Sequence, residues 1–246
     1  MKPRSLIAAL VFLLVVWQIL ALAMNIPLLP DPVVVIKTFW NHLADEIAGH
    51  FLASLWRVSA STIISIMAAV PAGLALGQFK KLDRIFSPLI YLLYPIPKVV
   101  FVPIVLLFLG VGDLAKIVTI FLILFFQILV LVKDQAASLR PELIESVRSL
   151  GAGRRALYLF VYLPASLPAI LTALRQSVGT AVAVLYVMEL FATQKGLGYY
   201  IYLNGSTLLD YPAMYAGIIA MSILGLGLYF AIDILERWLT PWQFAR

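Results

Sequence analysis

Six apolar stretches constrain the fold of this chain more than any other feature of its sequence. Each is about 20 residues long, the length that an α-helix needs to cross the hydrocarbon core of a bilayer. The stretches lie at residues 6–24, 58–77, 89–109, 114–132, 167–191 and 213–234. Strands of a membrane barrel would be about ten residues long and would alternate in polarity, and these stretches do neither. The sequence therefore predicts an all-α membrane protein, with six transmembrane helices in a single domain over residues 1–246.

The composition agrees with a chain that lies largely in lipid. Charged residues make up 12% of the sequence and hydrophobic residues 63%, whereas soluble domains carry about 25% charged residues. The chain has no cysteine, which excludes disulfides and thiolate metal sites.

The lysine and arginine residues predict how the chain is oriented, because they favour the cytoplasmic side of short loops. With the N-terminus inside, twelve of them fall in the cytoplasm: Lys2, Arg4, Lys80, Lys81, Arg84, Lys133, Arg140, Arg148, Arg154, Arg155, Arg237 and Arg246. Four fall outside: Lys37, Arg57, Lys116 and Lys195. We therefore expect a multi-pass inner-membrane protein with both termini in the cytoplasm, and the net charge of +6 reflects topology, not a nucleic-acid surface.

The first stretch has a second interpretation, as a cleaved signal peptide. Lys2 and Arg4 precede it, and Ala21-Leu22-Ala23 is similar to a cleavage site. Its apolar run is longer than the roughly 7–15 residues usual in signal peptides. The sequence therefore favours a retained helix, and the orientation of the remaining spans is the same in both cases.

One connection, at residues 134–163, is unusually long and basic. Within it, Pro141 and Gly151 are signals for the start and end of a helix. Four apolar side chains recur between them at helical spacing, with polar residues opposite: Leu143, Ile144, Val147 and Leu150. So short a helix is marginal alone in water, and its apolar face needs a partner. The residues alone favour two partners equally: the membrane surface or the chain's own bundle, and a groove in a second, cytoplasmic protein.

This connection resembles the signature loop of permease subunits of binding-protein-dependent ABC importers. The family pattern is Glu-Ala-Ala, three residues, Gly, nine residues, then Ile-x-Leu-Pro. The residues that keep its spacing are Glu145, Gly151, Val161, Leu163 and Pro164, with Val161 in the Ile position. Ser146 and Val147 replace the two alanines, and the bulkier Val147 is expected to change the docking fit.

Shorter motifs resemble the nitrate/sulfonate/taurine branch of these permeases. They are Leu29-Pro30-Asp31-Pro32, Ser54-Leu55-Trp56-Arg57, Pro95-Ile96-Pro97-Lys98 and Gly196-Leu197-Gly198-Tyr199. The resemblance implies a type I importer fold and a homodimer in which each copy docks a cytoplasmic coupling helix on an ABC ATPase subunit. It also implies that an extracytoplasmic binding protein delivers a small solute, such as nitrate, a sulfonate or taurine.

The resemblance further implies which residues dock the ATPase. They are Leu143, Ile144, Glu145, Val147, Leu150, Gly151, Leu163 and Pro164. The sequence lacks a Gly-x4-Gly-Lys-Ser/Thr phosphate loop, so we expect ATP and Mg²⁺ to bind the partner ATPase and no cofactor to bind this chain.

Three charged residues within or beside the spans are candidates for the translocation pathway, because a charge inside the bilayer is costly and needs a reason. Lys98 lies in a stretch interrupted by prolines, which indicates a kinked helix along the pathway or a simple packing kink. Arg175 either attracts an anion in the pathway or pairs internally, and internal pairing is favoured. Glu189 either contributes to a gate or pairs with Lys195 at the interface.

Other signals carry less weight. His42 and His50 are not one helical turn apart and predict an exposed amphipathic helix in preference to a metal site. Gly73 and Gly77 form a small-residue face that favours helix packing within the chain over a dimer seam. We find no catalytic constellation in the sequence.

The sequence as a whole predicts a translocation subunit, and not an enzyme, in an ATP-driven importer of a small solute. Two alternatives remain: an ion-coupled secondary transporter and a membrane scaffold whose amphipathic loop anchors a partner.

Overall fold

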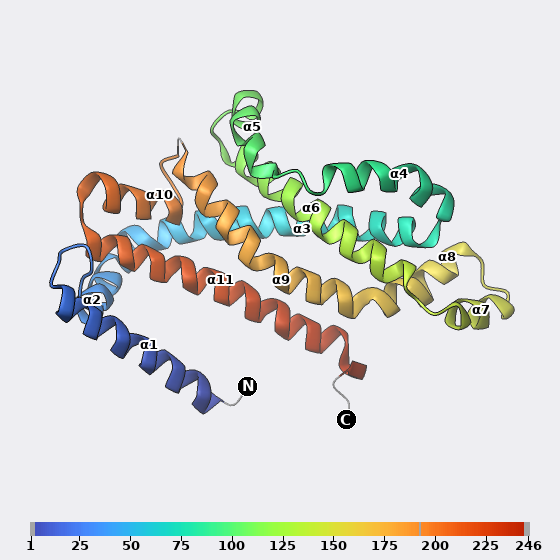
Figure 1. Ribbon diagram of the computed structural model, residues 1–246, viewed down its shortest axis with the longest axis horizontal. Coiled ribbons are helices and arrows are strands. Elements are labelled where there is room, and N and C mark those ends of the chain that lie inside the picture. Colours follow the sequence, from blue (N-terminus) through green and yellow to red (C-terminus); the bar gives the residue numbers. More distant parts are fainter. Residues whose placement is uncertain (1–2, 192, 244–246) are drawn as a thin grey trace. The chain divides into compact units, whose positions relative to one another are not determined.

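The computed structural model describes residues 3–191 and 193–243, and all regular structure in these residues is helical. Figure 1 shows the course of the chain. The longer helices are α1 (Pro3–Met24), α2 (Pro32–His42), α3 (Ala48–Gln78), α4 (Lys80–Leu93), α6 (Asp113–Ala137), α9 (Leu163–Leu190) and α11 (Tyr211–Leu239). The shorter helices are α5 (Val102–Leu109), α7 (Pro141–Ser149), α8 (Arg154–Leu157) and α10 (Leu197–Tyr202). Single turns of other helix types are η1 (Leu43–Ile47), η2 (Lys98–Phe101), η3 (Tyr158–Tyr162), η4 (Leu203–Leu208) and η5 (Pro241–Gln243).

The helices account for the apolar stretches of the sequence. Within the described residues, five helical segments are long and apolar enough to cross a membrane, and a bent pair supplies a sixth crossing if it forms one span. α6 begins at Asp113, so Leu114 to Lys116 belong to the fourth span. α3 is longer than its apolar stretch because η1 leads directly into it from α2.

The third stretch, residues 89–109, is a broken span. α4 and the segment Lys98–Leu109 meet at an angle of 77°. Pro95 and Pro97 explain the break, because proline lacks a backbone N–H and its ring clashes with the preceding helical turn. The carbonyls released at the end of α4 are bound by Lys98, whose Nζ donates to Leu93 O at 2.8 Å and to Tyr94 O at 2.6 Å. These two carbonyls are thereby satisfied within the chain, as a bilayer requires.

The helices group into two compact units. The first unit comprises the described residues of Met1–Leu55 and Glu189–Leu224. Here the indole Nε1 of Trp17 donates to Pro30 O at 3.2 Å, and the ring packs against Tyr215 with centroids 5.5 Å apart. Gly217 lets α11 approach α10, because a Cβ at this position would lie 2.8 Å from side-chain atoms of Tyr200 and Ile201.

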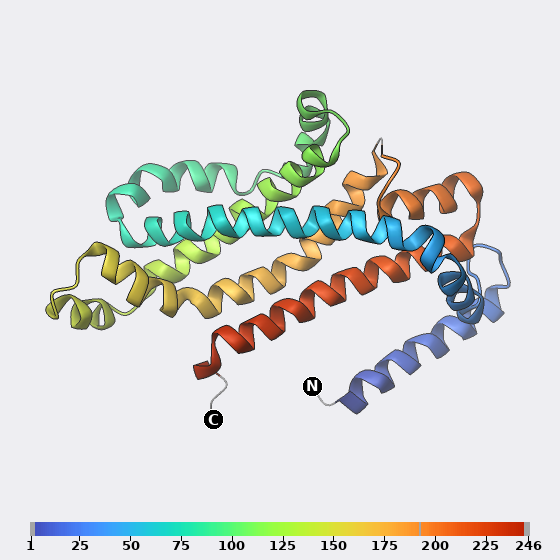
Figure 2. The same cartoon turned by 180° about the vertical axis from the view of Figure 1, so that it is seen from behind.

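The second unit comprises the described residues of Trp56–Met188 and Gly225–Arg246. Both views show α3 beside α4 and α6 (Figure 1, Figure 2). A Cβ on Gly73 would lie 2.9 Å from the side chain of Val132, and a Cβ on Gly77 would lie 2.4 Å from that of Ala136. The small-residue face predicted on α3 therefore packs against α6 of the same chain.

Candidate translocation groove and coupling loop

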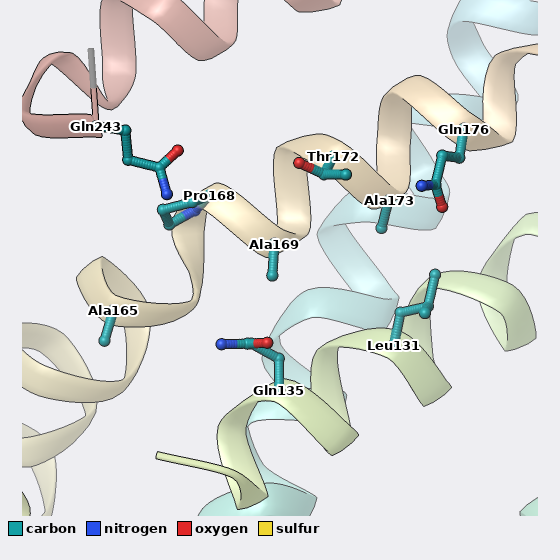
Figure 3. Close-up of a pocket in the computed structure, with 9 residues that line it drawn as sticks. All are labelled: Leu131, Gln135, Ala165, Pro168, Ala169, Thr172, Ala173, Gln176 and Gln243. Carbon is teal, nitrogen blue, oxygen red and sulfur yellow. The ribbon is translucent and has the colours of Figure 1, made fainter. Parts of the chain in front are cut away.

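Two open pockets lie between α6 and α9 in the second unit. The first, of about 470 Å³, is lined by Leu131, Gln135, Ala165, Pro168, Ala169, Thr172, Ala173, Gln176 and Gln243. Figure 3 shows Gln135 rising from α6 opposite Ala169 of α9. The second, of about 380 Å³, is lined by Tyr94, Pro95, Ile96, Pro97, Lys98, Val99, Ile123, Phe126, Gln127, Thr180 and Val184. We call the two pockets together the α6/α9 groove.

The groove brings neutral polar side chains together. On α6, Gln127 and Gln135 are eight residues apart, and each lines one of the two pockets. On α9, Gln176 and Thr180 are one turn apart and line the two pockets in turn. Amides and hydroxyls can donate and accept hydrogen bonds without the cost of a buried charge. The groove can therefore bind a small polar solute along an otherwise apolar wall.

These groove residues were missed by the sequence reasoning, which considered only charged groups within the spans. The detectable signal was the repetition of glutamine at positions 127 and 135 within an apolar helix. The facing positions on α9 could not be assigned before the two helices were known to pack together.

Lys98 borders the groove and also closes the broken span. Its ammonium caps the end of α4, as described above, and lies 4.8 Å from the centroid of the Phe126 ring. Backbone carbonyls at a helix C-terminus and the face of an aromatic ring both favour a cation. Both contacts offset the loss of water around the Lys98 charge.

Arg175 forms an ion-pair cluster with α11 and is not among the residues lining the groove. Its Nη1 lies 2.9 Å from Asp233 Oδ1 and 3.0 Å from Glu236 Oε2. Arg237 adds a second cation, 3.1 Å from Asp233. Two cations and two carboxylates make the cluster neutral. The Arg175 side chain is 26% exposed. Its pairing with carboxylates reduces the free-energy cost of keeping a charge partly buried in a spanning helix.

Glu189, at the other end of α9 and in the first unit, is fully buried. Its carboxylate oxygens lie 2.8 and 2.9 Å from Ser54 Oγ, and one of them accepts a hydrogen bond from the Gly198 N–H at 2.8 Å. Ser54 Oγ also accepts from the Leu197 N–H at 2.8 Å. Gly196 donates to His50 Nδ1 at 3.0 Å. Three successive N–H groups at the start of α10 are thus held by side chains from α3 and α9.

The same unit brings the second histidine into a polar cluster. His42 Nδ1 lies 3.3 Å from Glu46 and 3.1 Å from the hydroxyl of Tyr200. Burial, with the negative charges of Glu46 and Asp210, raises the pKa of the Tyr200 phenol well above its ordinary value. Tyr200 therefore stays protonated at neutral pH and can donate a hydrogen bond to His42.

The loop expected to couple to a partner forms the helix α7, as its boundary signals predicted. α7 begins at Pro141 and ends at Ser149, and none of its residues is buried. Leu150 is 86% exposed and Leu143 50% exposed. Gly151 has φ +84°, a conformation that L side chains rarely adopt, and it turns the chain out of the helix. Leu163 and Pro164 open α9 after a short bridge through α8 and η3.

Residues 61–243 match the family described as binding-protein-dependent transport system inner membrane component. The chain belongs to this family. It is therefore the membrane-spanning permease subunit of an ABC importer, a multi-span component of the inner membrane, and ATP hydrolysis belongs to a separate subunit.

Curated permeases are similar over nearly their whole length. The taurine transport system permease protein of Escherichia coli is 32% identical over 95% of this chain and 87% of that protein. The formylaminopyrimidine transport permease of Halalkalibacterium halodurans is 30% identical over 94% of this chain and 92% of that protein. An aliphatic sulfonates transport permease of Bacillus subtilis is 27% identical over 94% of this chain and 84% of that protein.

Solved structures have the same fold. The MetNI methionine ABC transporter in an inward-facing conformation matches with a TM-score of 0.68 and 23% identity, over 77% of this permease and 94% of that chain. A bacterial ABC transporter involved in alginate import matches with a TM-score of 0.64 and 17% identity, over 97% of both chains. The expectation of a type I importer fold is therefore confirmed.

Proposed function

We propose that two copies of this permease form the membrane domain of the importer, and that the α6/α9 groove is each copy's share of the translocation pathway. The groove is open in the single chain, and a second copy would close it. Its glutamine and threonine side chains supply polar contacts where the surrounding helix surfaces are apolar. Of the three charged candidates, Lys98 borders the groove; in this proposal Arg175 stabilises the α9–α11 contact and Glu189 holds the turn before α10.

The ATPase subunit, which binds ATP and Mg²⁺, docks on α7 in this proposal, and both chain termini lie on the same cytoplasmic side. The observation that carries the docking site is the exposed apolar surface formed by Leu143 of α7 and by Leu150, which directly follows α7 and is 86% exposed. Burying one leucine side chain in a partner would contribute about 1.5–3 kcal/mol. Glu145 would pair with a basic group at the docking site, and Gly151 provides the turn that presents the helix.

The solute in this proposal is taurine or another small sulfonate, delivered by an extracytoplasmic binding protein. Support comes from the taurine and sulfonate permeases among the relatives. The groove itself favours a solute recognised by hydrogen bonds, because its polar side chains apart from Lys98 are neutral. The Arg175 charge is neutralised by Asp233 and Glu236 and does not attract an anion. A zwitterion such as taurine therefore fits these neutral side chains better than a bare anion does.

The docking proposal is tested by purifying the permease from its native membrane and identifying the proteins that remain bound. The informative variant is Gly151→Pro, because proline fixes φ near −65° and cannot adopt the φ of +84° found there. We expect a P-loop ATPase to accompany the native chain and to be lost from this variant.

The matched control is Gly153→Pro, two residues further on. Gly153 has φ −75°, which proline adopts without strain, so this variant should keep the ATPase. Loss of the ATPase from both variants, or its absence from the folded native chain after cross-linking, would overturn the proposal and favour an ion-coupled transporter or a scaffold.

A further inference from the structure

A third cavity of the second unit carries an unusual concentration of positive charge. It measures about 540 Å³ and lies where the ends of α3 and α7 and the starts of α4 and α8 come together. Its cations are Lys80, Lys81, Arg148 and Arg154. None of the four forms an ion pair with a described carboxylate. Asp83, the acid at the start of α4, is instead paired with Lys133 at 3.1 Å.

An apolar pocket adjoins this basic cavity. It measures about 360 Å³ and lies between α3, α4 and α6, and every residue that lines it is apolar. Leu82 lines both cavities. Beyond Leu82, the apolar pocket follows α4 along Phe86 and Leu89, which are 46% and 52% exposed. Figure 2 shows α4 running alongside the end of α3 on this side of the unit.

A basic cavity that shares the lining residue Leu82 with an apolar pocket matches the polarity of a phospholipid, which has a charged headgroup and apolar chains. We propose that this site binds an anionic phospholipid, with its phosphate among Lys80, Lys81 and Arg154 and an acyl chain along α4. The four uncompensated cations favour an anionic headgroup over a zwitterionic one. The adjoining apolar pocket favours a lipid over a soluble phosphate, because such an ion leaves that surface uncovered.

The site lies at the same end of the unit as α7, and Arg148 of α7 lines it. In the proposed orientation this is the cytoplasmic leaflet, where anionic lipids attract basic segments. A bound headgroup would therefore contact the helix that is proposed to dock the ATPase. Lipid binding by the isolated chain does not depend on the proposed pathway, solute or docking partner.

The test is a lipid titration of the purified full-length permease in detergent, followed by native mass spectrometry. The probes are phosphatidylglycerol, phosphatidylcholine with the same acyl chains, and glycerol 3-phosphate as a headgroup without chains. We expect phosphatidylglycerol to bind about tenfold more tightly than phosphatidylcholine. Glycerol 3-phosphate should not displace it at equal concentration.

The variant Lys80→Gln/Lys81→Gln/Arg154→Gln should lose this preference. It leaves Arg148 in place, so that the proposed coupling helix is unchanged. The matched control is Arg84→Gln/Arg140→Gln/Arg155→Gln, which removes the same charge from neighbouring residues that do not line the cavity. The control should keep the preference.

A second variant, Leu82→Glu, keeps every cation and adds a carboxylate where the two cavities meet. Leu82 is 38% exposed, so this change is expected to be tolerated in the fold, and it should also abolish the preference. Equal loss in the control variant would show only diffuse attraction to basic loops and would overturn the proposal. Effective competition by glycerol 3-phosphate would assign the cavity to soluble phosphates, and equal binding of both phospholipids would reject an anionic site.

Discussion

At the scale of single residues, Glu189 shows how a fully buried carboxylate is accommodated in this protein. A buried charge is costly, and hydrogen-bond donors reduce that cost. Glu189 receives them from the Ser54 hydroxyl and the Gly198 backbone. The carboxylate also occupies the space beside Gly196, where a Cβ would lie 2.3 Å from its atoms. The turn before α10 is thus built around one acid and one glycine.

Gly196→Ala should destabilise this turn. Gly196 has φ +128°, and forcing an L residue into such a conformation costs about 1–3 kcal/mol before any displacement of Glu189. We expect a lower thermal unfolding midpoint for the purified variant. The control is Gly49→Ala in α3, where a Cβ meets nothing within 4 Å and the better helix propensity of alanine should leave stability equal or higher. Equal midpoints for the two variants would contradict this account of the turn.

At the scale of elements, α7 combines an exposed apolar surface with little packing of its own. Leu143 and Leu150 are therefore available to a partner and contribute little to the folded chain, whereas Ile144 and Val147 are half-buried. A substitution on this surface can therefore weaken docking without unfolding the protein.

Leu150→Ser is the corresponding change. Because Leu150 is 86% exposed, the stability of the isolated permease should stay within about 0.5 kcal/mol. Its affinity for the ATPase should fall by about tenfold, since the leucine is buried only in the complex. Affinity is measured with the two purified subunits, and Glu142→Gln on the polar face of α7 serves as the control. Unchanged affinity in Leu150→Ser would remove this residue from the docking surface.

The sequence predicted those elements whose signals are local. Pro141 and Gly151 bounded α7 to within two residues, and the long apolar runs predicted the spanning helices. It could not predict contacts that join distant segments. Arg175 meets Asp233 58 residues later in the chain, and Ser54 meets Glu189 across 135 residues. The α6/α9 groove was missed for the same reason. Polar residues on one helix indicate a binding groove only when the helix that faces them is known.

At the scale of the whole molecule, the proposed orientation puts α7 in the cytoplasm and the turn after α10 outside. The absence of native cysteine makes this directly measurable. Ser149→Cys should react with a membrane-impermeant maleimide only in inside-out vesicles. Thr207→Cys, on the exposed part of η4, should react only from the outside of intact cells or spheroplasts. The reverse pattern would invert the topology and would rule out ATPase docking on α7.

Energy coupling is the central claim about the whole molecule, and reconstituted transport tests it most directly. Proteoliposomes would contain this permease with its ATPase, and uptake of radiolabelled taurine would be measured with the binding protein present. The account predicts uptake that requires ATP, the ATPase and the binding protein together. Uptake by the permease alone under an ion gradient, with no dependence on ATP, would contradict it.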